Sequence, residues 1–236
     1  MVPVLRLAMW SGPRNVSTAF MRSWGNRDDT IVIDEPFYGH YLATTGAKHP
    51  GREEVIAHEE CDWRKVAAQL HAPMPLGTRV FYQKHMSHHL LPVMGREWLD
   101  GLTHTFLIRD PRDMLLSLDQ RLDALTLPDT GLPQQVEIFE GVRLLTGASP
   151  IVIDSRDLLS NPEGVLRKLC YRLKVPFTPR MLSWPAGRRG TDGIWAKHWY
   201  DQVEQSTGFG PYNPKAGELP PHLEALEREC RPYYEQ

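Results

Sequence analysis

The stretch from residue 5 to residue 25 constrains the fold of this chain more than any other. Residues 5–10 are largely apolar, the following turn contains a glycine and a proline, and residues 16–24 carry apolar side chains spaced for one helix face. A strand, a turn and a helix in this order place backbone N–H groups at a helix N-terminus, where an anion is favoured. The stretch therefore predicts a phosphate- or sulfate-binding loop. The alternative is an ordinary helix start that Ser17 or Thr18 caps.

Further apolar runs of strand length alternate with helical segments along the chain. The five predicted strands are residues 5–10, 30–33, 79–84, 103–108 and 151–154. The predicted helices are residues 16–24, 38–45, 53–70, a segment beginning near Pro111, 133–145, 161–173, 198–205 and 219–231. Strands that alternate with helices indicate a three-layer α/β/α fold with a central parallel sheet of about five strands, like that of the P-loop nucleotide kinases.

A second candidate anion-binding element begins where the fourth predicted strand ends. Arg109 follows that strand directly, and Ser117 comes eight residues later in the next helix. Ligands of open parallel sheets bind beyond the carboxyl ends of the strands, so we expect Arg109 to lie beside the first loop. That loop is not a Walker loop, because the pattern Gly-x-x-x-x-Gly-Lys-Ser/Thr is absent.

The bulk composition narrows the class of protein. A length of 236 residues suits one domain, residues 1–236. Within it, residues 184–217 are rich in Gly, Pro, Trp and His, and we expect them to form an ordered loop over the site. A net charge of −2 provides no basic field for nucleic acid. The three cysteines are far apart, which favours a soluble, cytoplasmic protein. No apolar run approaches the roughly 20 residues of a membrane span, so no membrane partner is expected.

These motifs together resemble those of the sulfotransferases that use 3′-phosphoadenosine 5′-phosphosulfate, and the resemblance extends from about residue 4 to residue 210. In that family a loop Pro-Lys/Arg-Ser-Gly-Thr-Thr/Ser holds the 5′-phosphosulfate, and the loop here is Pro13-Arg14-Asn15-Val16-Ser17-Thr18. Arg109 and Ser117 are similar to the family's 3′-phosphate site. A third family element, an Arg-Lys-Gly loop, is similar to Arg188-Arg189-Gly190.

The resemblance implies a reaction and a set of roles. The co-substrate would be 3′-phosphoadenosine 5′-phosphosulfate, the product adenosine 3′,5′-bisphosphate, and the acceptor a hydroxyl or amine of a small molecule, with no metal required. Arg14 would stabilise charge on the leaving phosphate, and Lys84 would act as a second cation on the sulfuryl oxygens. The sequence leaves the oligomeric state open, a homodimer included.

One residue departs from the family pattern. The loop glycine of the family is Val16 here, and a β-branched residue resists a positive φ. Either Asn15 takes the unusual conformation and the loop follows another path, or donor binding is altered.

Transfer to a hydroxyl or amine requires a base for the acceptor proton, and there are two candidates. Glu35 ends the second predicted strand, and resembles a carboxylate that bacterial carbohydrate sulfotransferases place there. His85 follows the third predicted strand, near the Lys-x-His of animal cytosolic members. If helical, His85, His88 and His89 would share one helix face and could hold a metal ion, although no partner carboxylate has recognisable spacing. The preferred interpretation is that these histidines line the acceptor pocket.

Two other functions remain open at this stage. One is a small-molecule P-loop kinase, which the missing Walker lysine disfavours. The other is a nucleotide-binding protein on the same scaffold without turnover, which the departure at Val16 allows.

Overall fold

The computed structural model describes residues 3–121, 124–214 and 217–236. At its centre is a five-stranded sheet in which all neighbouring strands are parallel. In spatial order the strands are β2 (Thr30–Asp34), β3 (Val80–Met86), β1 (Leu5–Ser11), β4 (Thr103–Ile108) and β5 (Ile151–Asp154). The predicted five-stranded parallel sheet is confirmed.

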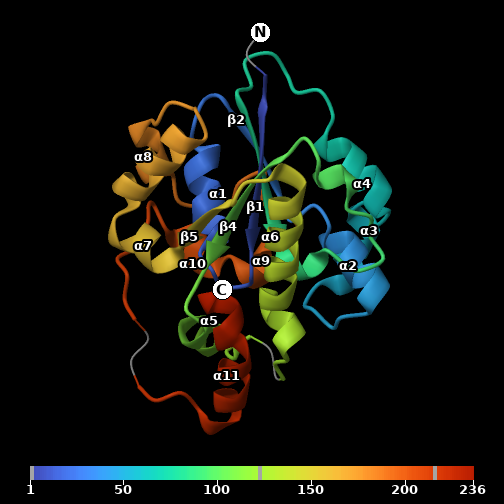
Figure 1. Cartoon of the computed structure of the whole chain (residues 1–236), viewed down its shortest axis with the longest axis vertical. Coiled ribbons are helices and arrows are strands. Elements are labelled where there is room, and N and C mark those ends of the chain that lie inside the picture. The colour runs from blue at the N-terminus through green and yellow to red at the C-terminus, as the bar shows by residue number, and fades with distance from the viewer. Residues whose placement is uncertain (1–2, 122–123, 215–216) are drawn as a thin grey trace.

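Helices cover both faces of the sheet and give the three layers visible in Figure 1. The α-helices are α1 (Ser17–Gly25), α2 (Tyr38–Thr45), α3 (Arg52–His58), α4 (Trp63–Leu70), α5 (Pro111–Leu118), α6 (Leu132–Thr146), α7 (Ser155–Ser160), α8 (Pro162–Arg172), α9 (Ala196–Trp199), α10 (Asp201–Gln205) and α11 (Pro221–Glu235). Short 3₁₀ helices cover Ser87–His89, Glu97–Leu99, Leu127–Thr130 and Pro179–Leu182.

The central strand β1 shows how the core is divided between the two faces. Successive side chains of a strand point to opposite sides of a sheet. Leu7 and Met9 pack with α1, α7 and α8 on one side, whereas Ala8 and Trp10 pack with α4 and α6 on the other. Burial on both faces explains why the strand has the continuous apolar run of a parallel sheet rather than an alternating pattern.

Two helix predictions were wrong in detail. Residues 53–70 form two helices, α3 and α4, because the first helix ends at His58. The second begins after Asp62, the N-cap, whose carboxylate accepts a hydrogen bond from the backbone N–H of Arg64. Residues 198–205 likewise belong to two helices, α9 and α10. The short helix α7 was not predicted.

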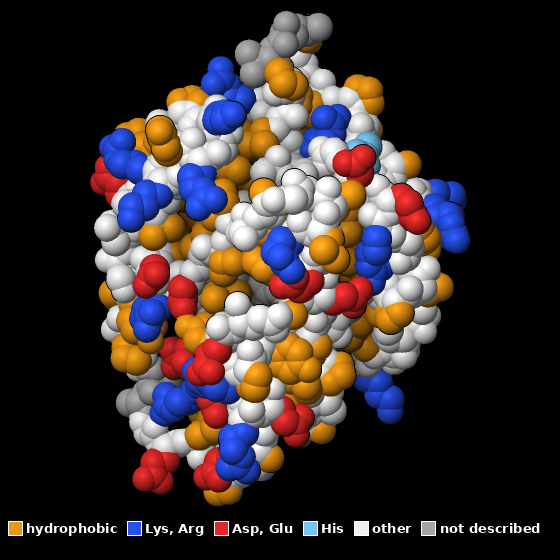
Figure 2. Space-filling view, viewed as in Figure 1, with side chains coloured by type: hydrophobic (Ala, Val, Ile, Leu, Met, Phe, Trp, Pro, Cys, Tyr) orange, Lys and Arg blue, Asp and Glu red, His pale blue; other side chains and the backbone are white. Residues whose placement is uncertain are grey.

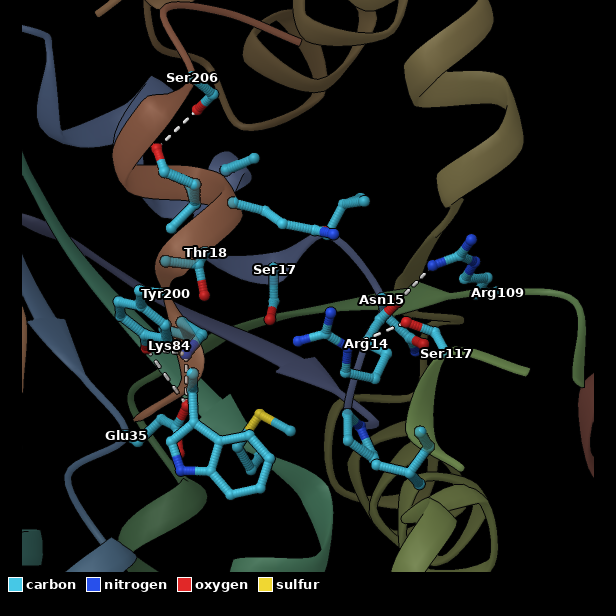
Figure 3. Close-up of a pocket in the computed structure, with 18 of the residues that line it drawn as sticks. Arg14, Asn15, Ser17, Thr18, Glu35, Lys84, Arg109, Ser117, Tyr200 and Ser206 are labelled. Atoms are coloured by element: carbon cyan, nitrogen blue, oxygen red, sulfur yellow. Dashed lines mark hydrogen bonds and ion pairs between the residues drawn. The ribbon is translucent and has the colours of Figure 1, made fainter. Parts of the chain in front are cut away.

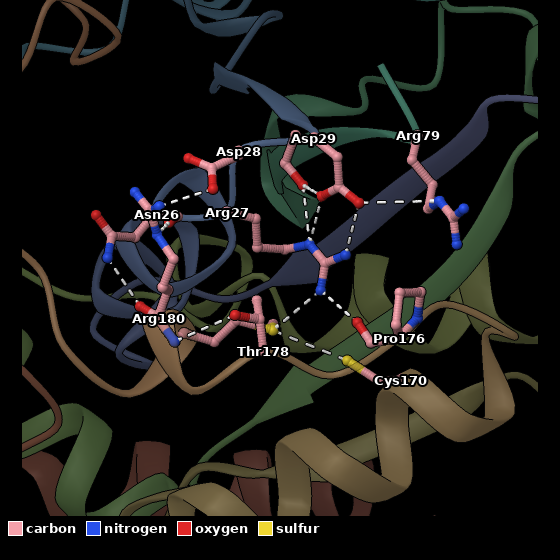
Figure 4. A network of polar contacts seen from close by, with 11 residues as sticks. Asn26, Arg27, Asp28, Asp29, Arg79, Cys170, Pro176, Thr178 and Arg180 are labelled. Carbon is pink, nitrogen blue, oxygen red and sulfur yellow. Dashed lines mark hydrogen bonds and ion pairs between the residues drawn. The ribbon is translucent and has the colours of Figure 1, made fainter. Parts of the chain in front are cut away.

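A buried arginine fixes the end of α1 that lies away from the predicted anion loop (Figure 4). Arg27, whose side chain is 2% exposed, pairs with Asp29 and donates from Nη1 to the carbonyl oxygen of Pro176 at 2.7 Å. Asn26 donates to the carbonyl oxygens of Arg180 and Ser183. A buried charge is tolerated when it is paired and hydrogen-bonded, so this network anchors α1 to the segment after α8.

The surface itself offers no broad anion-binding area on the face shown in Figure 2, where Lys and Arg side chains are interspersed with Asp and Glu. Among the described residues, no helix is both long and apolar enough to cross a membrane.

Candidate active site

The sheet register brings the ends of four strands together at one edge. Ser11, the last residue of β1, lies opposite Met86 of β3 and Leu107 of β4, and Asp34 of β2 lies opposite Lys84 of β3. The residues that follow these strands therefore meet where ligands of parallel sheets bind. Predictions made from widely separated parts of the sequence converge on this edge.

The loop after β1 carries unusual backbone angles. Val16 has φ 57° and ψ 18° at the N-cap of α1, and Arg14 has φ 60°. Of the two alternatives, the one in which Asn15 takes the positive φ is wrong, because Val16 itself has the positive φ. Among the described residues no side chain caps α1, so the alternative of a hydroxyl-capped helix is also wrong, and the first N–H groups of α1 have no side-chain acceptor there.

Hydrogen bonds from the end of β4 and the next helix hold this loop. Asn15 is buried and donates from Nδ2 to the carbonyl oxygen of Leu107 at 3.2 Å. Arg109 donates from Nη1 to the carbonyl oxygen of Arg14 at 2.7 Å, and Arg14 donates from Nε to Oγ of Ser117 at 3.0 Å. Burial, followed by repulsion from Arg121, lowers the pKa of Arg14, so the site favours an anion that would compensate this charge.

A second cluster lies on the other side of the site, around Lys84 (Figure 3). Its ammonium group donates to Asp34 Oδ1 at 2.8 Å, Glu35 Oε1 at 2.5 Å and the hydroxyl of Tyr200 at 2.8 Å. The Tyr200 hydroxyl donates in turn to Asp34 Oδ2 at 2.6 Å. The side chains of Lys84 and Asp34 are each 1% exposed, and that of Glu35 is 12% exposed. Lys84 is thus a buried cation held by two carboxylates.

Charge and burial set the protonation of this cluster. Burial disfavours the charge of Lys84, yet the attraction of Asp34 and Glu35 raises its pKa well above the usual value. The pKa of Glu35 is raised, chiefly by burial and also by the neighbouring Asp34, although Lys84 acts in the opposite direction. A carboxylate whose pKa is raised is a stronger base than one that only forms a salt bridge.

Both clusters line one cavity of about 470 Å³. The predicted site residues that line it are Pro13, Arg14, Asn15, Val16, Ser17, Thr18, Glu35, Lys84, Arg109 and Ser117. In Figure 3, Ser17 and Thr18 lie between the Lys84 cluster and the Arg14 side of the cavity. The predicted loop 184–217 contributes lining residues between Trp199 and Asn213, while residues 215 and 216 lie outside the described residues.

His85 is not among the cavity-lining residues. Strand β3 continues to Met86, so alternation turns Lys84 and Met86 toward the cavity and His85 toward the opposite face of the sheet. There His85 stacks on Trp10 with ring centroids 4.4 Å apart and lies 5.8 Å from the Phe37 ring. Burial lowers its pKa to about 3. The structure therefore gives His85 the surroundings of a core residue, and of the two candidate bases only Glu35 lines the cavity.

The loop Arg188-Arg189-Gly190 also lies outside the residues that line the cavity. The backbone N–H of Arg189 donates to Asp192 at 2.8 Å, and Asp192 forms a buried ion pair with Arg22 of α1 at 2.6 Å. In this structure the loop is thus tied to α1. Of the aromatic residues in this segment, Trp199 and Tyr200 line the cavity, whereas Trp184 packs against Phe209 and Trp195 packs against Tyr38.

His88 and His89 do line the cavity, as one interpretation of the sequence had them. They lie on a 3₁₀ turn after β3, and His85 belongs to the strand, so the three do not share a helix face. Within the described parts of the chain, no group of three or more His, Cys, Asp or Glu side chains is arranged to hold a metal ion.

Sequence reasoning missed two members of the Lys84 cluster. Asp34 precedes Glu35 at the end of an apolar run, which is a visible signal for a residue at the sheet edge. Tyr200 lies in the predicted loop 184–217. Its hydrogen bonds to Asp34 and Lys84 depend on how that loop folds back, which no local pattern indicates.

The geometry defines a class of protein: an α/β enzyme fold with an anion-binding loop at the carboxyl edge of a parallel sheet, beside a buried lysine–carboxylate cluster. The chain belongs to the sulfotransferase domain family, whose family model matches residues 5–235.

The curated relatives found by sequence carry a different name. Two Arabidopsis thaliana proteins, branched-chain-amino-acid aminotransferase-like proteins 2 and 1, are 35% and 36% identical over 226 residues. These alignments cover 95% of this chain and 40% of each relative, so the chain spans less than half of their length.

Solved structures share the fold. The sulfotransferase domain from the curacin biosynthetic pathway has a TM-score of 0.51 at 14% identity and covers 98% of this chain and 99% of its own. The sulfotransferase from Alicyclobacillus acidocaldarius has a TM-score of 0.57 at 12% identity, and the match covers 98% of this chain and 93% of that protein's chain. At these identities the likeness concerns the fold alone.

Proposed function

We propose that the chain transfers a sulfuryl group from 3′-phosphoadenosine 5′-phosphosulfate to a hydroxyl or amine of a small molecule. The observation that carries the proposal is the convergence of Arg14, Arg109, Ser117 and the start of α1 on the cavity that also contains Lys84 and Glu35. One side of the cavity provides cationic and N–H donors for a doubly phosphorylated nucleotide. The other provides a buried cation and a base beside it.

The 5′ end of the donor would bind to the loop Pro13–Thr18. The N–H groups at the start of α1 and the hydroxyls of Ser17 and Thr18 would hold the phosphate, and Arg14 would stabilise the charge that develops on the leaving oxygen. Arg109 and Ser117 would recognise the 3′-phosphate. Arg188, Arg189 and Gly190 remain predicted 3′-phosphate contacts, but the proposal does not depend on them because they are tied to α1 here.

Glu35 would accept the acceptor's proton as its oxygen or nitrogen attacks sulfur and the bond from sulfur to the 5′-phosphate oxygen breaks. The raised pKa of Glu35 and its position beside Lys84 suit that role. Lys84 would interact with the sulfuryl oxygens. A sulfuryl group carries less negative charge than a phosphoryl group, so these side chains can serve where phosphoryl transfer typically uses Mg²⁺.

Calorimetric titration tests donor recognition without requiring the acceptor. We expect adenosine 3′,5′-bisphosphate to bind tightly in EDTA, and ATP with Mg²⁺ to bind more weakly. Arg14→Ala and Arg109→Ala should each weaken bisphosphate binding about 10- to 100-fold, because each removes charge-assisted hydrogen bonds. Arg143→Ala is the matched control, since that side chain is 49% exposed and pairs with Glu140 outside the cavity.

The same experiment separates the competing functions. A preference for ATP and Mg²⁺ would support a kinase and overturn the donor assignment. Bisphosphate binding with no transfer of labelled sulfate to any member of a broad acceptor panel would support a binding protein without turnover. Normal affinity in Arg14→Ala or Arg109→Ala would remove that residue from the proposed site.

A further inference from the structure

The cavity has a second part whose chemistry differs from that of the donor site. Six ring side chains line it: Tyr38, Tyr41, His49, His88, His89 and Trp199. They come from α2, the following loop, the turn after β3, and α9. We call this set the ring wall. It adjoins the proposed base, because the backbone N–H of Tyr38 donates to the carbonyl oxygen of Glu35 at 2.9 Å.

Contacts among the rings make the wall a fixed surface. His89 lies between two tyrosines, with ring centroids 4.8 Å from Tyr38 and 4.7 Å from Tyr41. The hydroxyl of Tyr38 is hydrogen-bonded to Nδ1 of His49 at 2.9 Å, and the His49 ring lies 5.8 Å from Trp199. A pocket built of rings already in contact needs little ordering when a ligand binds.

The ring wall itself carries no positive charge at neutral pH. Burial lowers the pKa of His88 to about 3, lowers that of His89 well below its usual value, and lowers that of His49. Burial likewise raises the pKa of Tyr38 and Tyr41, which keeps both phenols protonated. In addition, Nδ1 of His88 and of His89 are buried without a hydrogen-bond partner among the described residues.

The charged groups next to the wall are predominantly negative. Asp129 lines the cavity, and its charge influences the pKa of Tyr41, His49 and His88. Lys84, the nearby cation, already pairs with two carboxylates, Asp34 and Glu35. The cations of the donor side do not belong to the ring wall. The charges that shift the pKa of Arg14 are those of Arg121, Asp201 and Arg109, which are not part of the wall either. Of the described Lys and Arg residues, those that line the cavity are Arg14, Lys84 and Arg109, and none of them belongs to the ring wall.

We propose that the ring wall and Asp129 form the acceptor site, and that the acceptor is a small alcohol bearing a positively charged amine. This rests on the proposed sulfuryl transfer. A quaternary or protonated ammonium group suits an apolar ring-lined pocket with one carboxylate, since cations are attracted to aromatic surroundings and to the carboxylate charge. The alcohol oxygen would form a bond to sulfur, the bond from sulfur to the donor's phosphate would break, and the proton would pass to Glu35. The ammonium group would remain unchanged.

Three alcohols of similar shape and different charge test the proposal by calorimetry. Choline is the cation, 3,3-dimethylbutan-1-ol is its neutral isostere, and 3-hydroxy-2,2-dimethylpropanoate is an anion. Binding is measured with the protein alone and with the protein saturated with adenosine 3′,5′-bisphosphate. We expect choline to bind about tenfold or more tightly than the neutral isostere, and the anion to bind most weakly. Equal binding of choline and the isostere, or stronger binding of the anion, would overturn the proposal.

A matched pair of variants separates charge from local structure. Asp129 also caps a 3₁₀ turn, since its Oδ2 accepts hydrogen bonds from the backbone N–H and the hydroxyl of Thr126. Asp129→Asn should weaken choline binding about tenfold and leave the neutral isostere unchanged. Thr126→Ala disrupts the same turn but keeps the carboxylate, so it should preserve the preference for choline. If the two variants lose choline binding equally, Asp129 has only a structural role and the proposal fails.

These outcomes are independent of the donor assignment. Failure of the bisphosphate to bind would refute the proposed function, while choline binding to the protein alone would still report on the ring wall. Conversely, normal bisphosphate binding with labelled sulfate transferred equally to all three alcohols would support the proposed function and refute the acceptor class.

Discussion

Replacing Asp34 with asparagine isolates the charge of one carboxylate in the Lys84 cluster. The substitution keeps the shape and an acceptor oxygen, while it removes the charge that faces Lys84 Nζ at 2.8 Å and the Tyr200 hydroxyl at 2.6 Å. Breaking a buried ion pair by removing one partner typically costs about 3–5 kcal/mol. Glu35 remains bonded to Lys84 at 2.5 Å, so the lysine is not left unpaired.

The expected loss is therefore close to one hydrogen bond to a charged group, about 2–3 kcal/mol in the free energy of unfolding. Urea unfolding monitored by circular dichroism measures it. Asp28→Asn is the matched control, because the Asp28 side chain is 76% exposed in its pair with Arg180 and should change stability by less than about 0.5 kcal/mol. Equal effects of the two substitutions would contradict the view that the Lys84 cluster is a buried electrostatic unit.

Asp34→Asn also tests the proposed base. Burial is the main cause of the raised pKa of Glu35, and the charge of Asp34 adds to it. Removing that charge should lower the pKa of Glu35, so the acidic limb of the pH profile of kcat for sulfate transfer should move to lower pH. An acidic limb that stays in place or moves to higher pH would show that another group is titrating.

Three further predictions concern the loop, the core and the metal requirement. Val16→Gly should change the free energy of unfolding by less than about 1 kcal/mol and leave bisphosphate affinity unchanged, since relief of the positive φ offsets the loss of the Val16 side chain from the core, whereas Val165→Gly in helix α8 should lower stability. The pKa of His85 falls to about 3 on folding, from roughly 6.5 in the unfolded chain. Neutral His85 therefore contributes to stability above pH 6.5, and below that pH the contribution declines by about 1.4 kcal/mol per pH unit. His85→Gln should make the free energy of unfolding depend less on pH in that range and should retain sulfate transfer. Dialysis against EDTA should leave the transfer rate unchanged, and a rate restored only by Mg²⁺ would contradict the proposed mechanism.

The sequence was sufficient for the fold because its signals are local. Most strands are short runs rich in apolar residues, and a helix or a 3₁₀ turn follows soon after each strand. The strand order β2-β3-β1-β4-β5 was not predicted, because continuous apolar runs do not specify their neighbours. Even so, parallel strands place all their carboxyl ends at one edge, so Arg14, Glu35 and Arg109 could be expected together without the order.

The errors arose where long-range contacts decide the outcome. The third strand was predicted to end at Lys84, which left His85 in a loop at the site; it runs two residues further, and alternation then turns His85 into the core. Arg188 to Gly190 resemble a family motif and remain predicted 3′-phosphate contacts, although in this structure they lie outside the cavity-lining residues and the neighbouring Asp192 forms a buried pair with Arg22. Neither the partner of Asp192 nor the position of Tyr200 has a signature at short sequence separation.

The strained residues connect the loop to the rest of the site. Arg14, Val16 and Glu35 are three of the four non-glycine residues with positive φ among those described, and all three line the cavity. Such conformations cost of order 1–3 kcal/mol each and persist only where surrounding contacts impose them. At the loop after β1 those contacts come from β4, through the hydrogen bonds that Leu107 accepts from Asn15 and that Arg109 donates to Arg14. Arg109 therefore has two roles in the proposed site, since the side chain that would bind the 3′-phosphate also holds the backbone that would bind the 5′-phosphate.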